Sequence, residues 1–203
     1  MNDVEAIMML APVIPVLVVD DVAHARPIAE ALVAGGLPVL EVTLRTPVAL
    51  DAISEMTKVE GAVVGAGTVL NERDLDASLQ AGARFIVSPG LTEKLGKKAI
   101  ASGIPFLPGI ATAGDIMRGL DIGLSRFKFF PAVAAGGLPA LTALASPFPH
   151  CRFCPTGGIT QENASEWLAL DAVLCVGGSW LVPRGNPDPG TIAAAARKAA
   201  RLS

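Results

Sequence analysis

Short apolar runs rich in β-branched residues recur along the chain, and each is followed by a stretch with helical patterning. Their starts lie roughly 20–26 residues apart, which is the length of one strand, one helix and two tight loops. Several runs are almost wholly apolar, as expected of parallel strands that are covered on both faces. The predicted strands are Val13–Val19, Val39–Thr43, Ala62–Gly65, Phe85–Ser88, Phe106–Gly109, Arg126–Phe129, Arg152–Thr156 and Ala172–Val176.

The intervening helices carry start and stop signals. Asn71 and Thr92 are predicted N-caps, and Gly35-Gly36 is predicted to end the helix that follows the first strand. Pro27 lies inside that helix and leaves its start uncertain. A further short helix over about residues 2–10 is expected before the first strand.

Eight β–α units without a linker predict an α/β protein, a single-domain (β/α)8 TIM barrel over residues 1–203. The alternative is a doubly wound sheet with a nucleotide fingerprint. Gly65-Ala66-Gly67 begins like that fingerprint, but its third glycine would fall at Leu70. The pattern therefore favours the closed barrel.

The amino-acid composition indicates which binding partners and which cellular compartment to expect. Hydrophobic residues make up 51% of the chain, charged residues 17%, and the net charge is −3. Without a basic face or run, nucleic acid and membrane are unexpected partners. The apolar stretch from Ala6 to Val19 contains two prolines and is too short to span a bilayer. Three cysteines without framework spacing indicate reduced thiols and a cytoplasmic protein. Cys151 and Cys154 match a C-x-x-C pattern, but residues three apart on a strand face opposite ways.

Active sites of such barrels lie at the carboxyl ends of the strands. The polar residues expected at those ends are Glu41, Thr43, Arg45, Thr68, Ser88, Lys128, Thr156 and Ser179. Of six lysines, Lys128 alone is expected within a strand. Alternation places Phe127 and Phe129 on the opposite face, so the amine would point into the barrel. Burial disfavours the charged amine and makes the neutral nucleophile available, whereas the alternative is a lysine that snorkels to solvent.

Glu41 stands in an otherwise apolar strand, where a buried carboxylate needs a partner. That partner is either Arg45 or Lys128, and the group is either half of a structural ion pair or a general acid and base. Thr43 shares its face of the strand. Arg45 follows one step further along, where its guanidinium could bind a substrate carboxylate through two hydrogen bonds.

Glycine pairs follow the last two strands, at Gly157-Gly158 and at Gly177-Gly178, the second continuing to Ser179. In barrels of this type a phosphate binds between these two loops, held by backbone N–H groups and a helix N-terminus. Glycines allow the backbone to approach the anion closely.

A metal site is not expected. His24 falls in a predicted helix and His150 in a loop, and no His or Cys cluster stands at the strand ends. Chemistry that depends on a bound zinc ion is therefore not expected.

Six motifs resemble those of bacterial 2-keto-3-deoxy-6-phosphogluconate (KDPG) aldolases, a family bifunctional with 4-hydroxy-2-oxoglutarate (KHG) aldolase. They occur in the family's order and at its spacing over about Pro12 to Pro183. The motifs are Glu41–Thr46, Gly65–Leu70, Ser88–Thr92, Phe127–Pro131, Cys154–Ile159 and Gly177–Trp180.

The resemblance implies a homotrimeric class I lyase of the Entner–Doudoroff pathway, which splits KDPG into pyruvate and D-glyceraldehyde 3-phosphate without a cofactor. By motif, Lys128 would form the Schiff base and Glu41 would transfer protons. The substrate contacts implied are Arg45 and Thr68 to the carboxylate, Pro89, Phe130 and Thr156 along the pocket, and Gly157, Gly158, Gly178 and Ser179 to the phosphate. One departure is Val133, where the family pattern leads us to expect an acidic residue.

Three alternatives stay open at this point. An aldolase of the galactonate series would differ in the C4 configuration that it accepts. A phosphate-binding barrel isomerase would need the glycine loops but has no use for Lys128. A non-catalytic binding or scaffold protein is supported only by the high apolar content.

Overall fold

A computed structural model describes residues 4–203 of the protein. Within this range the chain forms parallel strands in the order β7-β6-β5-β4-β3-β2-β1-β8. The strands are β1 (Val13–Leu17), β2 (Val39–Thr43), β3 (Val63–Gly67), β4 (Ile86–Ser88), β5 (Phe106–Ile110), β6 (Arg126–Phe129), β7 (Arg152–Pro155) and β8 (Val176–Gly178). This order is that of a barrel in which each strand pairs with its neighbour in the sequence.

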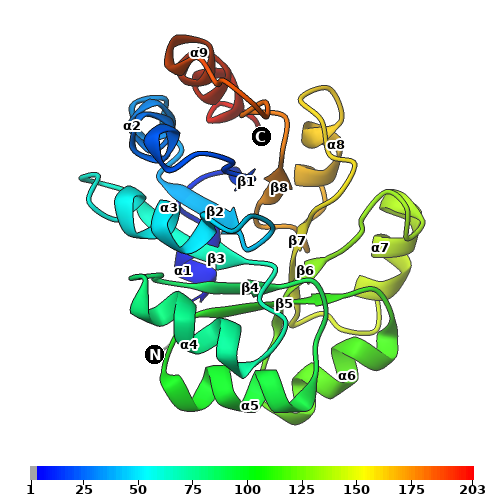
Figure 1. The fold of residues 1–203 in the computed structure, drawn as a ribbon. Coiled ribbons are helices and arrows are strands. Elements are labelled where there is room, and N and C mark those ends of the chain that lie inside the picture. The colour runs from blue at the N-terminus through cyan, green and yellow to red at the C-terminus, as the bar shows by residue number, and fades with distance from the viewer. Residues whose placement is uncertain (1–3) are drawn as a thin grey trace.

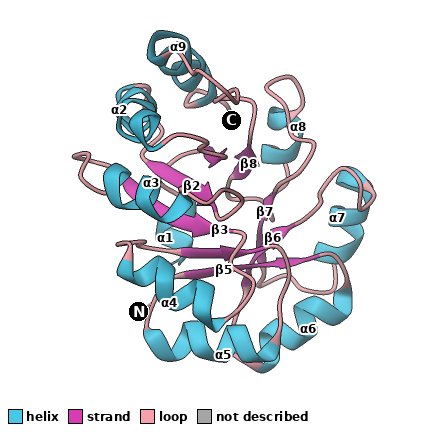
Figure 2. Cartoon of the chain, viewed as in Figure 1, coloured by secondary structure: helices cyan, strands magenta, loops and turns pink. Residues whose placement is uncertain are grey.

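The last strand closes the barrel. β8 pairs with β1 from Val13↔Val176 onward, and its segment meets β7 through the bridges Phe153↔Val173 and Thr156↔Gly177. Figure 2 shows the strands gathered at the centre of the molecule and the helices around them. The predicted (β/α)8 fold is confirmed.

The helices form the outer ring in Figure 1 and alternate with the strands along the chain. Asn71 accepts a hydrogen bond from the Asp74 N–H and Thr92 from the Leu95 N–H, so both predicted N-caps are confirmed. Pro27 lies in the first turn of its helix, where its missing N–H has no intrahelical acceptor. The helices are α1 (Val4–Met8), the 3-10 helix η1 (Val22–His24), α2 (Ala25–Ala34), α3 (Ala49–Met56), α4 (Glu72–Gln80), α5 (Glu93–Ser102), α6 (Ala113–Asp121), α7 (Gly137–Ala145), α8 (Ala164–Leu168) and α9 (Pro189–Ala199).

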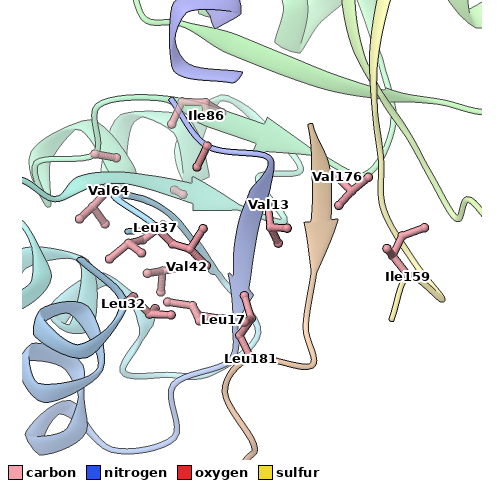
Figure 3. Close-up of a cluster of buried hydrophobic side chains, with 14 of the residues drawn as sticks. Val13, Leu17, Leu32, Leu37, Val42, Val64, Ile86, Ile159, Val176 and Leu181 are labelled. Atoms are coloured by element: carbon pink, nitrogen blue, oxygen red, sulfur yellow. The ribbon is translucent and has the colours of Figure 1, made fainter. Parts of the chain in front are cut away.

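Two apolar layers hold the barrel together. The larger one lies between strands and helices, and Figure 3 shows Leu17 and Val42 from β1 and β2 beside Leu32 from α2. The smaller one fills the barrel interior and includes Phe85 and Leu107. Val4 and Met8 of α1 belong to this inner layer, so α1 covers the interior at the end opposite the strand carboxyl ends. An active site can therefore form only at the carboxyl ends of the strands.

The last strand was predicted wrongly in its position. Ala172–Val176 was expected, but β8 is Val176–Gly178, because Val173 makes only an isolated bridge and the ladder with β1 begins at Val176. β3 likewise extends to Gly67, two residues beyond its predicted end, since its glycines pair with β2. The expected helix over about residues 2–10 is observed as α1, with residues 2 and 3 outside the described range. In residues 4–203 no helix combines the length and apolarity needed to cross a membrane.

Candidate active site

The centre of the site is a buried ion pair between Lys128 of β6 and Glu41 of β2. The Lys128 Nζ donates to both carboxylate oxygens of Glu41, at 2.8 Å to Oε1 and 3.1 Å to Oε2. Lys128 is 5% exposed and Glu41 is 3% exposed. The partner of Glu41 is therefore Lys128 and not Arg45, and the lysine does not snorkel to solvent.

This pair spans the barrel, because β2 and β6 stand opposite each other in the strand order. Phe127 and Phe129 are fully buried in the layer between strands and helices, so alternation sends Lys128 inward as predicted. The Phe130 ring lies over the amine, with its centroid 5.6 Å from Nζ. An amine in this setting is shielded from water on most sides and has a single carboxylate beside it.

Gly67, the last residue of β3, makes room for the Glu41 carboxylate. A Cβ at this position would stand 2.3 Å from Glu41 Oε1 and 2.9 Å from its Cδ. This role of Gly67 was not predicted from the sequence. The sequence does contain an indication of it. Gly65 pairs in register with Glu41, and Gly67, two residues further along the strand, points to the same inward face.

Arg45 and Thr68 meet at the rim directly beyond this pair. The Arg45 Nε donates to Thr68 Oγ1 at 3.3 Å, and Thr68 has a positive φ of 60° immediately after Gly67. Thr68 is therefore held in a conformation that non-glycine residues rarely adopt. The hydroxyl of Thr43, on the same face of β2 as Glu41, is buried and donates to the Leu17 carbonyl at 2.8 Å.

The loop after β7 has the geometry of an anion-binding turn. Gly157 and Gly158 have φ values of 100° and 80°, which side-chain-bearing residues rarely adopt. Successive backbone N–H groups in such a turn can form a concave site for an anion.

Thr156 links this loop to the one after β8. Its side chain lies over Gly177, where a Cβ would come within 2.2 Å of Thr156 Oγ1. Gly178 is required for a different reason, since a Cβ there would stand 1.9 Å from the Trp180 ring. Ser179 is exposed and lines a surface pocket together with Arg45.

The remaining predicted contact, Pro89, lies half-buried in the loop after β4, where its carbonyl oxygen packs against Gly109. The Ser88 hydroxyl donates to the Gly90 carbonyl and so shapes this loop. Val133 is 48% exposed and packs against Gly158. Within residues 4–203, no group of three or more His, Cys, Asp or Glu side chains could hold a metal ion.

Two thiols lie inside the barrel near the ion pair. Cys154 and Cys175 belong to the inner layer, whereas Cys151 packs in the outer one, so the C-x-x-C cysteines face opposite ways as predicted. The hydrogen bond with Cys154, burial and the nearby Glu41 raise the pKa of the Cys175 thiol well above its usual range. Cys175 is therefore a neutral thiol at physiological pH.

The fold and the site together define a class of protein, a barrel enzyme with a buried amine and carboxylate at the carboxyl ends of its strands. A family description, "KDPG and KHG aldolase", matches residues 4–195. The 2-dehydro-3-deoxy-phosphogluconate aldolase of Zymomonas mobilis is 61% identical over 199 residues, which cover 98% of this chain and 96% of that protein.

Solved structures of aldolases are also similar to this chain over nearly its whole length. A Zymomonas mobilis structure described as 2-keto-3-deoxy-6-phosphogluconate aldolase with 3-phosphoglycerate superposes with a TM-score of 0.98 at 60% identity, and covers 100% of this chain and 97% of that one. A KDPG aldolase from Legionella pneumophila, described as holding pyruvate captured as a covalent carbinolamine intermediate, has a TM-score of 0.92 at 44% identity, with coverage of 99% and 98%.

The chain belongs to the KDPG and KHG aldolase family. The resemblance predicted from the six motifs is confirmed, and so is the enzyme class, an aldolase and thus a lyase. The roles of the individual site residues stay predictions.

Proposed function

We propose that the protein cleaves KDPG reversibly to pyruvate and D-glyceraldehyde 3-phosphate through a Schiff base on Lys128. The observation that carries this proposal is the contact of a 5% exposed amine with both oxygens of one carboxylate, at 2.8 and 3.1 Å. Such a pair can transfer a proton within itself and release a neutral, nucleophilic amine. The carbinolamine named for the Legionella relative is the first covalent intermediate of this chemistry.

The reaction begins when Glu41 takes a proton from the Lys128 ammonium. The neutral Nζ attacks the C2 ketone carbon and forms a carbinolamine. Glu41 returns the proton to the carbinolamine oxygen, which leaves as water, and the iminium remains. Both steps are short-range, because each Glu41 oxygen already contacts Nζ.

Carbon–carbon cleavage follows from the iminium. Glu41, directly or through a water, takes the C4 hydroxyl proton while the C3–C4 electron pair moves into the iminium. Glyceraldehyde 3-phosphate leaves and an enamine of pyruvate remains. Protonation at C3 and hydrolysis of the iminium release pyruvate and restore Lys128. No step requires a metal ion or another cofactor.

The two anionic ends of the substrate are assigned to different residues at the carboxyl ends of the strands. Arg45 and Thr68 bind the keto-acid carboxylate, with Pro89, Phe130 and Thr156 lining the pocket. This is supported by the Arg45–Thr68 hydrogen bond next to Gly67 and by the Phe130 ring over Nζ.

The phosphate binds to the Gly157-Gly158 turn and to Gly178 and Ser179. The positive φ values of Gly157 and Gly158 support this assignment. The Thr156↔Gly177 bridge brings the two loops together.

The decisive test compares Lys128→Ala with Lys98→Ala, in which the removed amine is a surface partner of Asp76 at 3.0 Å. Pyruvate release from KDPG should fall to background in Lys128→Ala and stay at the wild-type rate in Lys98→Ala. Wild-type turnover by Lys128→Ala would reject the Schiff-base assignment. Comparing KDPG with its C4 epimer tests the gluconate-series preference against the galactonate series.

We further propose a homotrimer in the cytoplasm. The trimer is supported by exposed apolar side chains that an interface could cover, namely Leu70, Met117 and Leu120. The compartment is supported by three unpaired cysteines. Light scattering should give three times the chain mass of 20.8 kDa, and a mass equal to one chain would reject the trimer.

A further inference from the structure

A second arginine faces the same pocket as Arg45 and Ser179. This rim pocket, of about 390 Å³, has Arg45, Ser179 and Arg184 as its polar lining, and its apolar wall includes Val18 and Val182. None of the described residues that line it is acidic. Its two guanidinium groups and its exposed position suit the anionic end of a substrate.

Arg184 lies in the segment that leads from β8 to α9 (Figure 1) and is tethered to Asp20. The Arg184 Nε donates to Asp20 Oδ2 at 3.1 Å, and one terminal nitrogen donates to Oδ1 at 2.6 Å. This two-pronged hydrogen bond holds the pKa of the Asp20 carboxyl below its usual range. The guanidinium is therefore positioned at the pocket by a carboxylate that stays ionised at neutral pH.

The tether is of a kind that a stronger anion can displace. The Arg184 side chain is 70% exposed and that of Asp20 37%, and such exposed ion pairs contribute little net stability because water solvates both partners. The planar guanidinium fork fits phosphate as well as carboxylate, and a phosphate carries more charge. The Asp20 carboxylate is already partly exposed, so water can solvate it once a phosphate has displaced it from Arg184.

We propose that Arg184 is a specificity-determining residue that binds the substrate phosphate at the outer edge of the rim pocket, with Asp20 holding its guanidinium there until the phosphate displaces the carboxylate. This rests on the proposed function, which places the phosphate at Ser179 in the same pocket. The phosphate would thus be bound by backbone N–H groups on its inner side and by Arg184 on its outer side. Phosphorylated substrates would be preferred over their unphosphorylated counterparts.

A purely structural role makes the opposite prediction for one variant. If the Asp20–Arg184 pair only clamps two loops, removing either partner loosens the same contact and both variants weaken binding alike. If Arg184 binds phosphate in competition with Asp20, its loss weakens binding but loss of the Asp20 charge strengthens it. The sign of the Asp20→Asn effect therefore separates the two roles.

The experiment measures kcat and KM of Arg184→Gln and Asp20→Asn with KDPG and with 2-keto-3-deoxygluconate, the same acid without its phosphate. Arg26→Gln is the matched control, because it removes an exposed arginine that is paired with Glu30 elsewhere on the surface. We expect Arg184→Gln to raise KM for KDPG about 3- to 10-fold with kcat within about twofold. Asp20→Asn should lower that KM about 2- to 5-fold. KM for the unphosphorylated acid should stay unchanged in both variants, and Arg26→Gln should match the wild type with either substrate.

The proposal is overturned if Asp20→Asn raises KM for KDPG, or if Arg184→Gln raises KM equally for both substrates. Calorimetric titration with inorganic phosphate adds a readout that needs no turnover, and Arg184→Gln should bind phosphate more weakly than the wild type. Absence of aldol cleavage in the wild-type protein would reject the proposed function. Equal phosphate binding by Arg184→Gln and wild type would reject the role of Arg184 alone.

Discussion

Replacement of Gly67 by alanine tests how the Glu41 carboxylate is positioned. The added methyl would stand 2.3 Å from Glu41 Oε1, 2.7 Å from Cγ and 2.9 Å from Cδ, whereas ordinary contact begins near 3.4 Å. The carboxylate must therefore move by about 1 Å. Because both of its oxygens contact Lys128 Nζ, at 2.8 and 3.1 Å, such a shift breaks at least one of these hydrogen bonds.

We expect kcat for KDPG to fall at least about 100-fold in Gly67→Ala, since displacing a catalytic group by about 1 Å has effects of this order. That loss corresponds to about 2.7 kcal/mol of transition-state stabilisation. Overpacking of the core should also destabilise the fold by about 1–3 kcal/mol. Coupled detection of pyruvate gives kcat, and thermal unfolding gives the stability.

Two comparisons separate positioning from general damage. Gly114→Ala, on α6, adds a methyl whose nearest neighbours lie at 3.6 and 3.8 Å, and it should leave both turnover and stability unchanged. In a Glu41→Ala background the clash is gone, so adding Gly67→Ala should there lower the melting temperature much less than it does in the wild type. Wild-type turnover in a folded Gly67→Ala protein would refute the view that the precise place of the Glu41 carboxylate matters.

Three further predictions follow from the same site. Glu41→Gln keeps the shape but cannot relay protons, so turnover should fall about 10²–10⁴-fold while pyruvate adduct formation falls less; undiminished turnover would make Glu41 a structural partner only. Gly157→Val would block the anion-binding turn and should raise KM for KDPG more than Ser179→Ala, which removes one hydroxyl hydrogen bond worth about 1 kcal/mol. Turnover of the unphosphorylated substrate KHG should change far less in both variants, and equal losses on both substrates would contradict the phosphate assignment. Chelators such as EDTA should leave activity unchanged, and inactivation that zinc reverses would overturn the metal-free mechanism.

Much of the barrel was predictable because strand signals here are local. Val39–Thr43 and Arg126–Phe129 were predicted with their observed bounds, since each is a short run between turn residues. The position of β8 was not predictable in the same way. Two of its three residues are glycines, which carry no strand signal, and in the apolar run before it Val173 forms only an isolated bridge.

The residues of the site could be predicted from the sequence better than the contacts between them. Alternation identified Lys128 as an inward lysine, but its contact with Glu41, 87 residues away, depends on β2 and β6 facing each other across the closed barrel. The Asp20–Arg184 pair depends on the same closure, because it joins the segments that follow β1 and β8. The space provided by Gly67 depends instead on the register between the neighbouring strands β2 and β3. Sequence patterns describe what one element buries, and they do not give the distance between side chains on opposite strands.

The central claim, a Schiff base on Lys128, is tested most directly by trapping it. The protein is incubated with pyruvate, the iminium is reduced with borohydride, and the modified peptide is mapped by mass spectrometry. We predict one reduced pyruvate per chain, attached to Lys128, and no adduct in Lys128→Ala. Modification of any other lysine, or the absence of an adduct in the wild type, would contradict the mechanism.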